Sequence, residues 1–251
     1  MRDLIEPLET IEVLGVRVHK LVRPQLLKFI IKAANSQQKT VIAYVNVHAI
    51  NLAYKLDWLR DFLNRADLVL CDGFGVGLGA RLKGYSFKAE HRMTCPDWIE
   101  ELAILCQANH LSLFLLAGMP GVADEAAQKL QRVAPRLRVG VYHGYFEKTG
   151  PENDRVIGRI NAFKPNILAV GFGSPVQEAW IQTNMNRIKA IVFLEVGGCF
   201  DYYTGRLFRA PRWMTDHGFE WLSRLLAEPG RLWRRYLVGL PLFFYRLLKS
   251  K

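Results

Sequence analysis

The feature that most constrains the fold is an alternation of short apolar runs with helical patterns. Six runs of strand length are nearly all apolar, at 40–47, 67–71, 111–118, 139–143, 166–173 and 190–198. Helical patterns lie between them, at 49–65, 96–108, 121–133 and 175–187. Strands that are apolar on both faces are typical of a parallel sheet covered by helices. We therefore predict an α/β fold, a Rossmann-like, mostly parallel sheet with helices on both faces.

The two ends of the chain depart from this alternation. The segment "IEVLGVRVHKLV" near the N-terminus predicts a small hairpin before the sheet. From Arg206 onward the pattern changes to helical stretches rich in arginine and aromatic residues, interrupted by prolines. We predict a Rossmann-like domain over residues 1–204 and a helical, basic and aromatic appendage over residues 205–251.

Positive charge is concentrated in that appendage. The 251 residues carry a formal net charge of +11, and residues 205–251 hold ten Lys or Arg against three acidic residues. This excess favours an anionic partner. The longest uncharged stretch of the tail, 236–245, falls well short of the roughly 20 apolar residues of a spanning helix. Two interpretations remain, a segment lying in the interface of an anionic membrane or a helix packed on the core with a solvated basic face.

Cysteine spacing and the N-terminus indicate a cytosolic protein. The four cysteines form no CxxC or Cys/His zinc pattern, which is typical of free thiols in a reducing compartment. The first fifteen residues contain acids where a secretory signal has an apolar core. Nucleic-acid binding has no motif to support it.

A glycine-rich turn, "VLCDGFGVGLGARLKG", follows the second apolar run and contains one acid, Asp72. Gly75, Gly77 and Ala80 fit a variant of the dinucleotide fingerprint. No convincing second strand ending in an acid follows, so the dinucleotide interpretation is weak. Asp72-Gly73 is also a common turn signal, and local spacing favours the turn over a phosphate cradle.

Other strand-end turns combine small and polar residues. In "GFGSPVQEAW", Ser174 is predicted to cap a helix that begins at Pro175, with Gln177 closing the capping box. The start of such a helix also binds anions, so capping and ligand contact are both open for Gln177. His143 is more typical of a structural histidine than of a catalytic one. The sequence shows no HExxH, Walker A, GxSxG or DxD motif.

Taken together, the motifs resemble the WecG/TagA/CpsF glycosyltransferase family from about Asn46 to Leu240. The resemblance is carried by "NVHAINLA", "ADLVLCDGFGVGLGARLKG", Arg92 with Asp97, "LFLLAGMPGVADEAAQKL", "HGYF", "GFGSPVQEAWI", "VGGCFDYYTGRLFRAPRWM" and "GFEWLSRLLAEPGRLWRRYLVG". It implies an inverting glycosyltransferase that moves a sugar from a UDP-sugar to a polyprenyl-diphosphate-linked sugar in cell-wall, capsule or exopolysaccharide synthesis. N-acetylmannosamine, its uronic acid and glucose are the donor sugars that it leaves open.

The resemblance also assigns residues. Asp72 falls on the proposed catalytic base, Asn46, Arg92 and Gln177 fall on polar active-site positions, and Asp201 falls where a donor-nucleotide contact is expected. Further substrate contacts are expected at the strand ends and in the appendage, from Gly118, Tyr145, Gly173, Arg206, Arg209 and Arg212. Tyr44 and Cys95 depart from the family, which often has Thr and Gly there.

The same resemblance sets the expected partners. They are a UDP-sugar donor, a polyprenyl-diphosphate-linked acceptor and an anionic membrane surface at the cytoplasmic face, with no nucleic acid, cofactor or metal. Positive charge for the departing diphosphate is expected from helix N-termini and arginines. A nucleotide-binding oxidoreductase of the NAD type is the alternative, and a non-catalytic adaptor is a third interpretation.

Overall fold

The computed structural model describes residues 8–208, 210, 214 and 218–250. Its strands are β1 (Thr10–Val13), β2 (Val16–His19), β3 (Thr40–Val45), β4 (Leu68–Cys71), β5 (Leu113–Ala117), β6 (Val139–Tyr142), β7 (Ile167–Gly171) and β8 (Val192–Glu195). Its α-helices are α1 (Arg23–Ala34), α2 (Val47–Ala53), α3 (Asp57–Arg65), α4 (Phe74–Leu82), α5 (Ile99–Ala108), α6 (Val122–Val133), α7 (Gly150–Phe163), α8 (Val176–Asn184), α9 (Cys199–Thr204), α11 (Glu220–Ala227), α12 (Pro229–Trp233) and α13 (Gly239–Lys249). Short helical turns are η1 (Ala89–His91), η2 (Cys95–Asp97), η3 (Met185–Arg187) and η4 (Arg234–Val238).

Six strands form the central sheet, in the order β4-β3-β8-β7-β5-β6. The pairs β3 with β8, β8 with β7, β7 with β5 and β5 with β6 are all parallel. Every residue of β5, β7 and β8 is buried, whereas the residues of the edge strand β6 are half-buried. The predicted mostly parallel sheet is therefore confirmed, and each of its strands lies within one of the six apolar runs.

The described residues form two compact units. Unit 1 contains Pro24–Ile42 and Cys95–Arg206, and unit 2 contains residues 8–23, Ala43–Thr94 and the described residues after Arg206. The described residues after Arg206 belong to unit 2, where α13 packs on α2 and α4. The domain division after residue 204 stays a prediction. The appendage is thus part of a unit that also contains the ends of β3 and β4.

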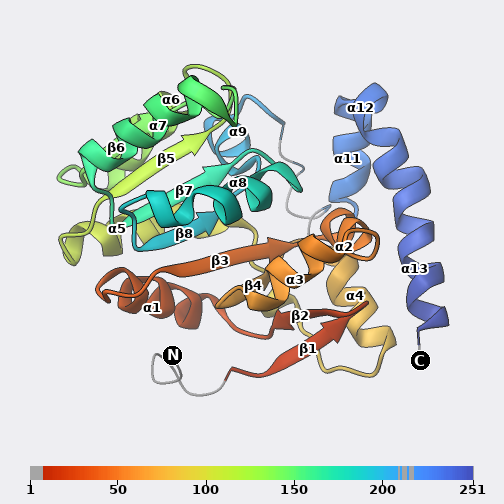
Figure 1. Ribbon diagram of the computed structural model, residues 1–251. Coiled ribbons are helices and arrows are strands. Elements are labelled where there is room, and N and C mark those ends of the chain that lie inside the picture. Colours follow the sequence, from red (N-terminus) through yellow and green to blue (C-terminus); the bar gives the residue numbers. More distant parts are fainter. Residues whose placement is uncertain (1–7, 209, 211–213, 215–217, 251) are drawn as a thin grey trace. The chain divides into compact units, whose positions relative to one another are not determined.

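In unit 1, helices pack along the strands (Figure 1). α6 contacts β5 and β6, α7 contacts β6, and α8 contacts β8. In unit 2, the predicted hairpin is confirmed, since β1 pairs antiparallel with β2. Its turn consists of Leu14 and Gly15, both at positive φ, which is the geometry of a tight two-residue hairpin. The hairpin strand β2 contacts β4.

Two predicted helices differ from those observed. The pattern over 49–65 is divided into α2 and α3 by an extended residue, Leu56, and Asp57 begins α3 with an acid in its first turn, where the helix dipole favours negative charge. The helix predicted from Pro175 begins at Val176 and gives way to η3 at Met185. A local pattern cannot locate such breaks, because the apolar periodicity continues through them.

Candidate functional site

A cavity of about 300 Å³ lies within unit 2. Its wall is formed by the turn after β3, by the turn after β4 with the start of α4, and by the C-terminal segment. The lining residues from the first two turns are Asn46, Val47, His48, Asp72, Gly73, Phe74, Gly75 and Leu78. Those from the C-terminal segment are Gly218, Phe219, Trp221, Arg224, Arg235, Tyr236, Leu240 and Phe244. The cavity is thus mostly apolar and aromatic with a few polar groups, as ligand sites commonly are.

Asp72 and Asn46 are brought together at this cavity by adjacent strand ends. The backbone N–H of Asp72 donates to the carbonyl of Val45 at 2.8 Å, so the first residue after β4 is tied to the last residue of β3. Asn46 is the N-cap of α2, and its Oδ1 accepts from the N–H of Ala49 at 3.1 Å. This capping bond fixes the Asn46 side chain and leaves its amino group to act as a donor.

Arg92 lies beside the same strand end but does not line the cavity. It forms a parallel bridge with Cys71, and the N–H of Met93 donates to the carbonyl of Cys71 at 2.8 Å. Burial raises the pKa of the Cys71 thiol, the Asp72 carboxylate raises it further, and the Arg92 guanidinium lowers it. The two charged groups therefore lie close to one buried, unreactive thiol.

The glycine run serves mainly for packing. A Cβ on Gly75 would lie 2.6 Å from Cγ2 of Val47, and one on Gly79 would lie 2.8 Å from Cζ of Phe243. These glycines let α2 and α13 approach α4 closely. Gly73, at φ +93°, has no atom within 4 Å of such a Cβ, so it is the glycine that leaves open space next to Asp72.

Among the described residues, two arginines line the cavity, and neither of them was singled out from the sequence. Arg224 of α11 and Arg235 of η4 line it. Arg206 belongs to unit 1, and Arg209 and Arg212 lie outside the described residues. The sequence could have indicated Arg224 in part. Trp221 and Arg224 are three residues apart, so in a helix they share one face.

Carboxyl ends of the strands also converge within unit 1. The N–H of Gly144 donates to the carbonyl of Gly118 at 2.7 Å, joining the ends of β5 and β6. A Cβ on Gly171 would clash with the carbonyl oxygen of Gly197, so the backbone after β8 passes close to the end of β7. Of the predicted contacts here, Gly118 is at φ +67° and Tyr145 is 68% exposed.

The turn after β7 does not form the predicted capping box. Pro175 is the N-cap residue of α8, and Gln177 Oε1 accepts from the N–H of Gly173 at 3.2 Å, while Ser174 Oγ donates to Glu178 Oε1 at 2.5 Å. The box fails because Ser174 lies one residue before the cap and bonds to a carboxylate instead. Gln177 and Glu178 are fully buried, and burial raises the pKa of Glu178. Gln177 thus closes this turn in the observed state.

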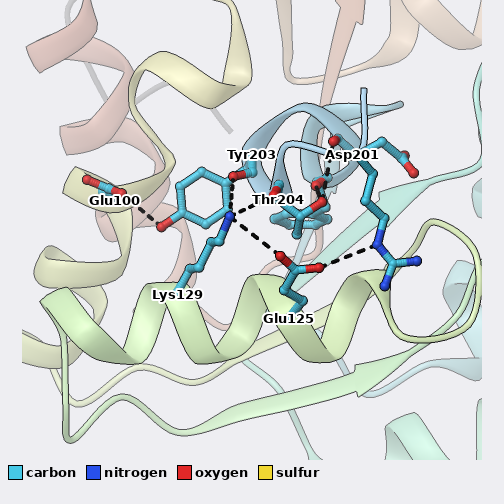
Figure 2. Close-up of polar contacts among 8 residues, drawn as sticks. Glu100, Glu125, Lys129, Asp201, Tyr203 and Thr204 are labelled. Atoms are coloured by element: carbon cyan, nitrogen blue, oxygen red, sulfur yellow. Dashed lines mark hydrogen bonds and ion pairs between the residues drawn. The ribbon is translucent and has the colours of Figure 1, made fainter. Parts of the chain in front are cut away.

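Asp201 lies in the first turn of α9, whose end is held by α6 (Figure 2). Lys129 Nζ donates to the carbonyl of Thr204 at 2.7 Å and lies 3.5 Å from Glu125 Oε1. Glu125 also pairs with Arg206, with 3.4 Å between Oε2 and Nε. A lysine is well placed here because the last carbonyls of a helix favour positive charge. Arg206 is therefore held at α6 by an exposed ion pair.

The described residues contain neither a membrane-spanning helix nor a cluster of metal ligands. No helix in 8–208 or 218–250 combines the length and apolar character needed to cross a bilayer. Within the same part of the chain, no three His, Cys, Asp or Glu side chains gather where they could hold a metal ion. Metal independence stays a prediction.

The fold is a Rossmann-like sheet with a carboxylate at the end of one of its strands, and comparison with known sequences identifies the family. The model of the glycosyl transferase WecG/TagA/CpsF family matches residues 11–251, so the chain belongs to this family. Its relatives include N-acetylglucosaminyldiphosphoundecaprenol N-acetyl-beta-D-mannosaminyltransferase from Staphylococcus aureus strains NCTC 8325 / PS 47, COL and MSSA476. Each is 29% identical to this chain over 251 residues, covering 96% of this chain and 93% of the relative.

Proposed function

We propose that this protein is an inverting glycosyltransferase that moves a sugar from a UDP-sugar to a polyprenyl-diphosphate-linked sugar. The observation that carries the proposal is the position of Asp72, a carboxylate in the wall of a mostly apolar cavity, next to the open space at Gly73. Among the possible donors we favour UDP-N-acetylmannosamine over the uronic acid and glucose, because the relatives are named N-acetyl-beta-D-mannosaminyltransferases.

In the proposed reaction, Asp72 takes the proton of an acceptor hydroxyl group. The oxygen then attacks the anomeric carbon of the donor from the face opposite the leaving group, and UDP departs with the bonding electron pair. One carboxylate suffices, because no covalent sugar–enzyme intermediate forms. A β-linked product from an α-linked UDP-sugar requires this single inversion.

We assign the cavity of unit 2 to the acceptor. Aromatic rings of Phe219, Trp221 and Tyr236 offer apolar faces to a sugar ring, and Arg224 and Arg235 offer guanidinium groups to a diphosphate. Asp201 and the start of α8 stay predicted contacts of the donor nucleotide within unit 1. Positive charge from the protein is expected to replace a metal ion on the diphosphate groups.

Membrane attachment is proposed for the outer face of the C-terminal segment. Leu237, Val238, Tyr245 and Leu248 are exposed there. Arg246 is turned inward, with its guanidinium donating to Asn51 Oδ1 at 2.8 Å, so the basic contribution at the surface comes from other residues such as Lys249. Exposed apolar side chains beside cations are typical of segments that bind an anionic membrane surface, here at the cytoplasmic face.

The decisive experiment offers a panel of UDP-sugars with synthetic polyprenyl-diphosphate N-acetylglucosamine and identifies the product by mass spectrometry and by the anomeric configuration in its NMR spectrum. A β-linked disaccharide from UDP-N-acetylmannosamine is expected. Thermal unfolding with UDP and with NAD is the accompanying control, since only a ligand that binds the folded state raises the midpoint. A shift with NAD alone, without transfer, would refute the proposal.

A further inference from the structure

His48 is a polar group of the cavity to which the family resemblance assigns no role. It lies in the first turn of α2, two residues after Asn46, and lines the same cavity as Asp72. The side chain is half-buried, so the imidazole has lost part of its hydration. A half-buried polar ring at a cavity wall favours a ligand that restores its hydrogen bonds.

Three other polar groups of the wall already have partners inside the protein. Asn46 caps α2 through Oδ1, and Asp72 and Arg224 each interact with other residues of the chain. No hydrogen bond from the described residues reaches the His48 ring. In its neutral form the ring has one N–H donor and one nitrogen acceptor. His48 therefore offers unused hydrogen-bonding capacity next to the carboxylate.

We propose that His48 is a substrate-contacting residue, which hydrogen-bonds the hydroxyl or acetamido groups of the acceptor sugar bound in the cavity of unit 2. This inference rests on the proposed function, because it takes the acceptor to be the ligand of that cavity. It gives His48 a role in binding and selecting the sugar, while the transferred proton goes to Asp72.

The charges around His48 agree with a role in sugar binding rather than in proton transfer. Of the residues that the structure describes, Asp72, Arg224, Arg235 and Tyr236 are the charged or titratable ones that line the cavity with it. Burial, with the positive charge of Arg235 as a second cause, lowers the pKa of His48 to about 4. The imidazole is therefore neutral at physiological pH, where it both donates and accepts, and a hydroxyl group is a partner for either nitrogen.

The test compares three variants with the wild-type protein. His48→Leu removes the hydrogen-bonding capacity of both ring nitrogens with a side chain of similar size. His48→Gln keeps one donor and one acceptor, in an amide group. His110→Asn is the matched control, because His110 is exposed in unit 1 and its backbone is at φ 56°, a conformation that Asn tolerates. The binding probe is N-acetylglucosamine diphosphate with a short prenyl chain, titrated by calorimetry. Transfer to the same compound is measured in parallel.

We expect His48→Leu to weaken probe binding and raise the acceptor KM about tenfold, as for the loss of one or two hydrogen bonds. His48→Gln should recover much of this loss, and His110→Asn should match the wild type. The thermal midpoint of His48→Leu should not fall, because no bond within the folded protein is lost. The pH profile of kcat/KM for His48→Gln should keep the wild-type shape between pH 6 and 9.

Three results would overturn the inference. If His48→Leu binds the probe like the wild type while the wild type transfers sugar, His48 is no contact and the proposed function stands. If His48→Gln loses a limb of the pH profile, the imidazole carries a proton instead. If the wild type neither binds the probe nor transfers sugar to it, the proposed function fails and the role of His48 fails with it.

Discussion

The contact between α4 and α13 gives a sharp prediction, because it depends on a glycine, Gly79, whose lack of a side chain lets the two helices approach. A Cβ on Gly79 would lie 2.8 Å from Cζ of Phe243, 3.0 Å from its Cε1 and 3.3 Å from Cδ2 of Leu247. Phe243 has 0% of its surface exposed, so its ring can move only by displacing buried neighbours or into internal space. Overpacking of this kind costs about 1–3 kcal/mol. Alanine regains about 1 kcal/mol of helix propensity over glycine, so Gly79→Ala should cost about 1 kcal/mol net.

Gly158 is the matched control, since it lies within α7, is exposed, and has no atom within 4 Å of the place that a Cβ would occupy. Gly158→Ala should therefore stabilise by about 0.5–1 kcal/mol. Urea unfolding followed by circular dichroism measures both variants. A double variant with Phe243→Leu should recover part of the loss. If Gly79→Ala is as stabilising as Gly158→Ala, α13 does not pack on α4 as the structure shows.

Three further predictions concern turnover, acid stability and membrane binding. Asp72→Asn should keep the thermal midpoint and lower kcat by about 10²–10⁴-fold, because an amide cannot take the acceptor proton; near-normal turnover would exclude Asp72 as the base. Burial, and then Arg17, lowers the pKa of His19 to about 4, below its value in the unfolded chain. The free energy of unfolding should therefore have its full value above about pH 6.5 and fall by about 2 kcal/mol on going to pH 5. His19→Gln should flatten this dependence in urea unfolding at several pH values, and an unchanged slope would contradict it. Leu248→Glu, at a residue 79% exposed, should weaken binding to anionic liposomes in a flotation assay without lowering the midpoint, whereas wild-type binding would exclude this face.

The strands were predictable from the sequence because burial on both faces leaves a continuous apolar run. Val192–Glu195 and Ile167–Gly171 lie in the middle of such runs, as burial requires. The end of each strand then places its next residue at the edge where ligands bind, which is why Asp72 and Asn46 could be expected at one place. Their chemical roles stay predictions.

Residues brought in by distant segments were not predictable in the same way. Arg235 reaches the cavity because α13, which follows η4, packs against α2 and α4, a contact between segments far apart in the chain. The glycine run was predicted as a turn rather than a phosphate cradle, and the packing role of Gly79 is evident only once Phe243 lies against it. Arg206 was expected at a substrate diphosphate, but Glu125 on a neighbouring helix is within ion-pair distance of it. A local pattern contains no information about such partners.

The C-terminal helix combines three roles that a truncation could not separate. Leu240 and Phe244 line the cavity, Phe243 and Leu247 are buried, and Leu248 is exposed. Removing the segment would open the cavity and expose apolar core surface at the same time as it removed the face assigned to the membrane. Loss of transfer in a truncated chain would therefore follow from any of the three causes. Only substitutions confined to one face can tell them apart, since Leu248→Glu leaves the cavity wall and the buried contacts of the helix in place.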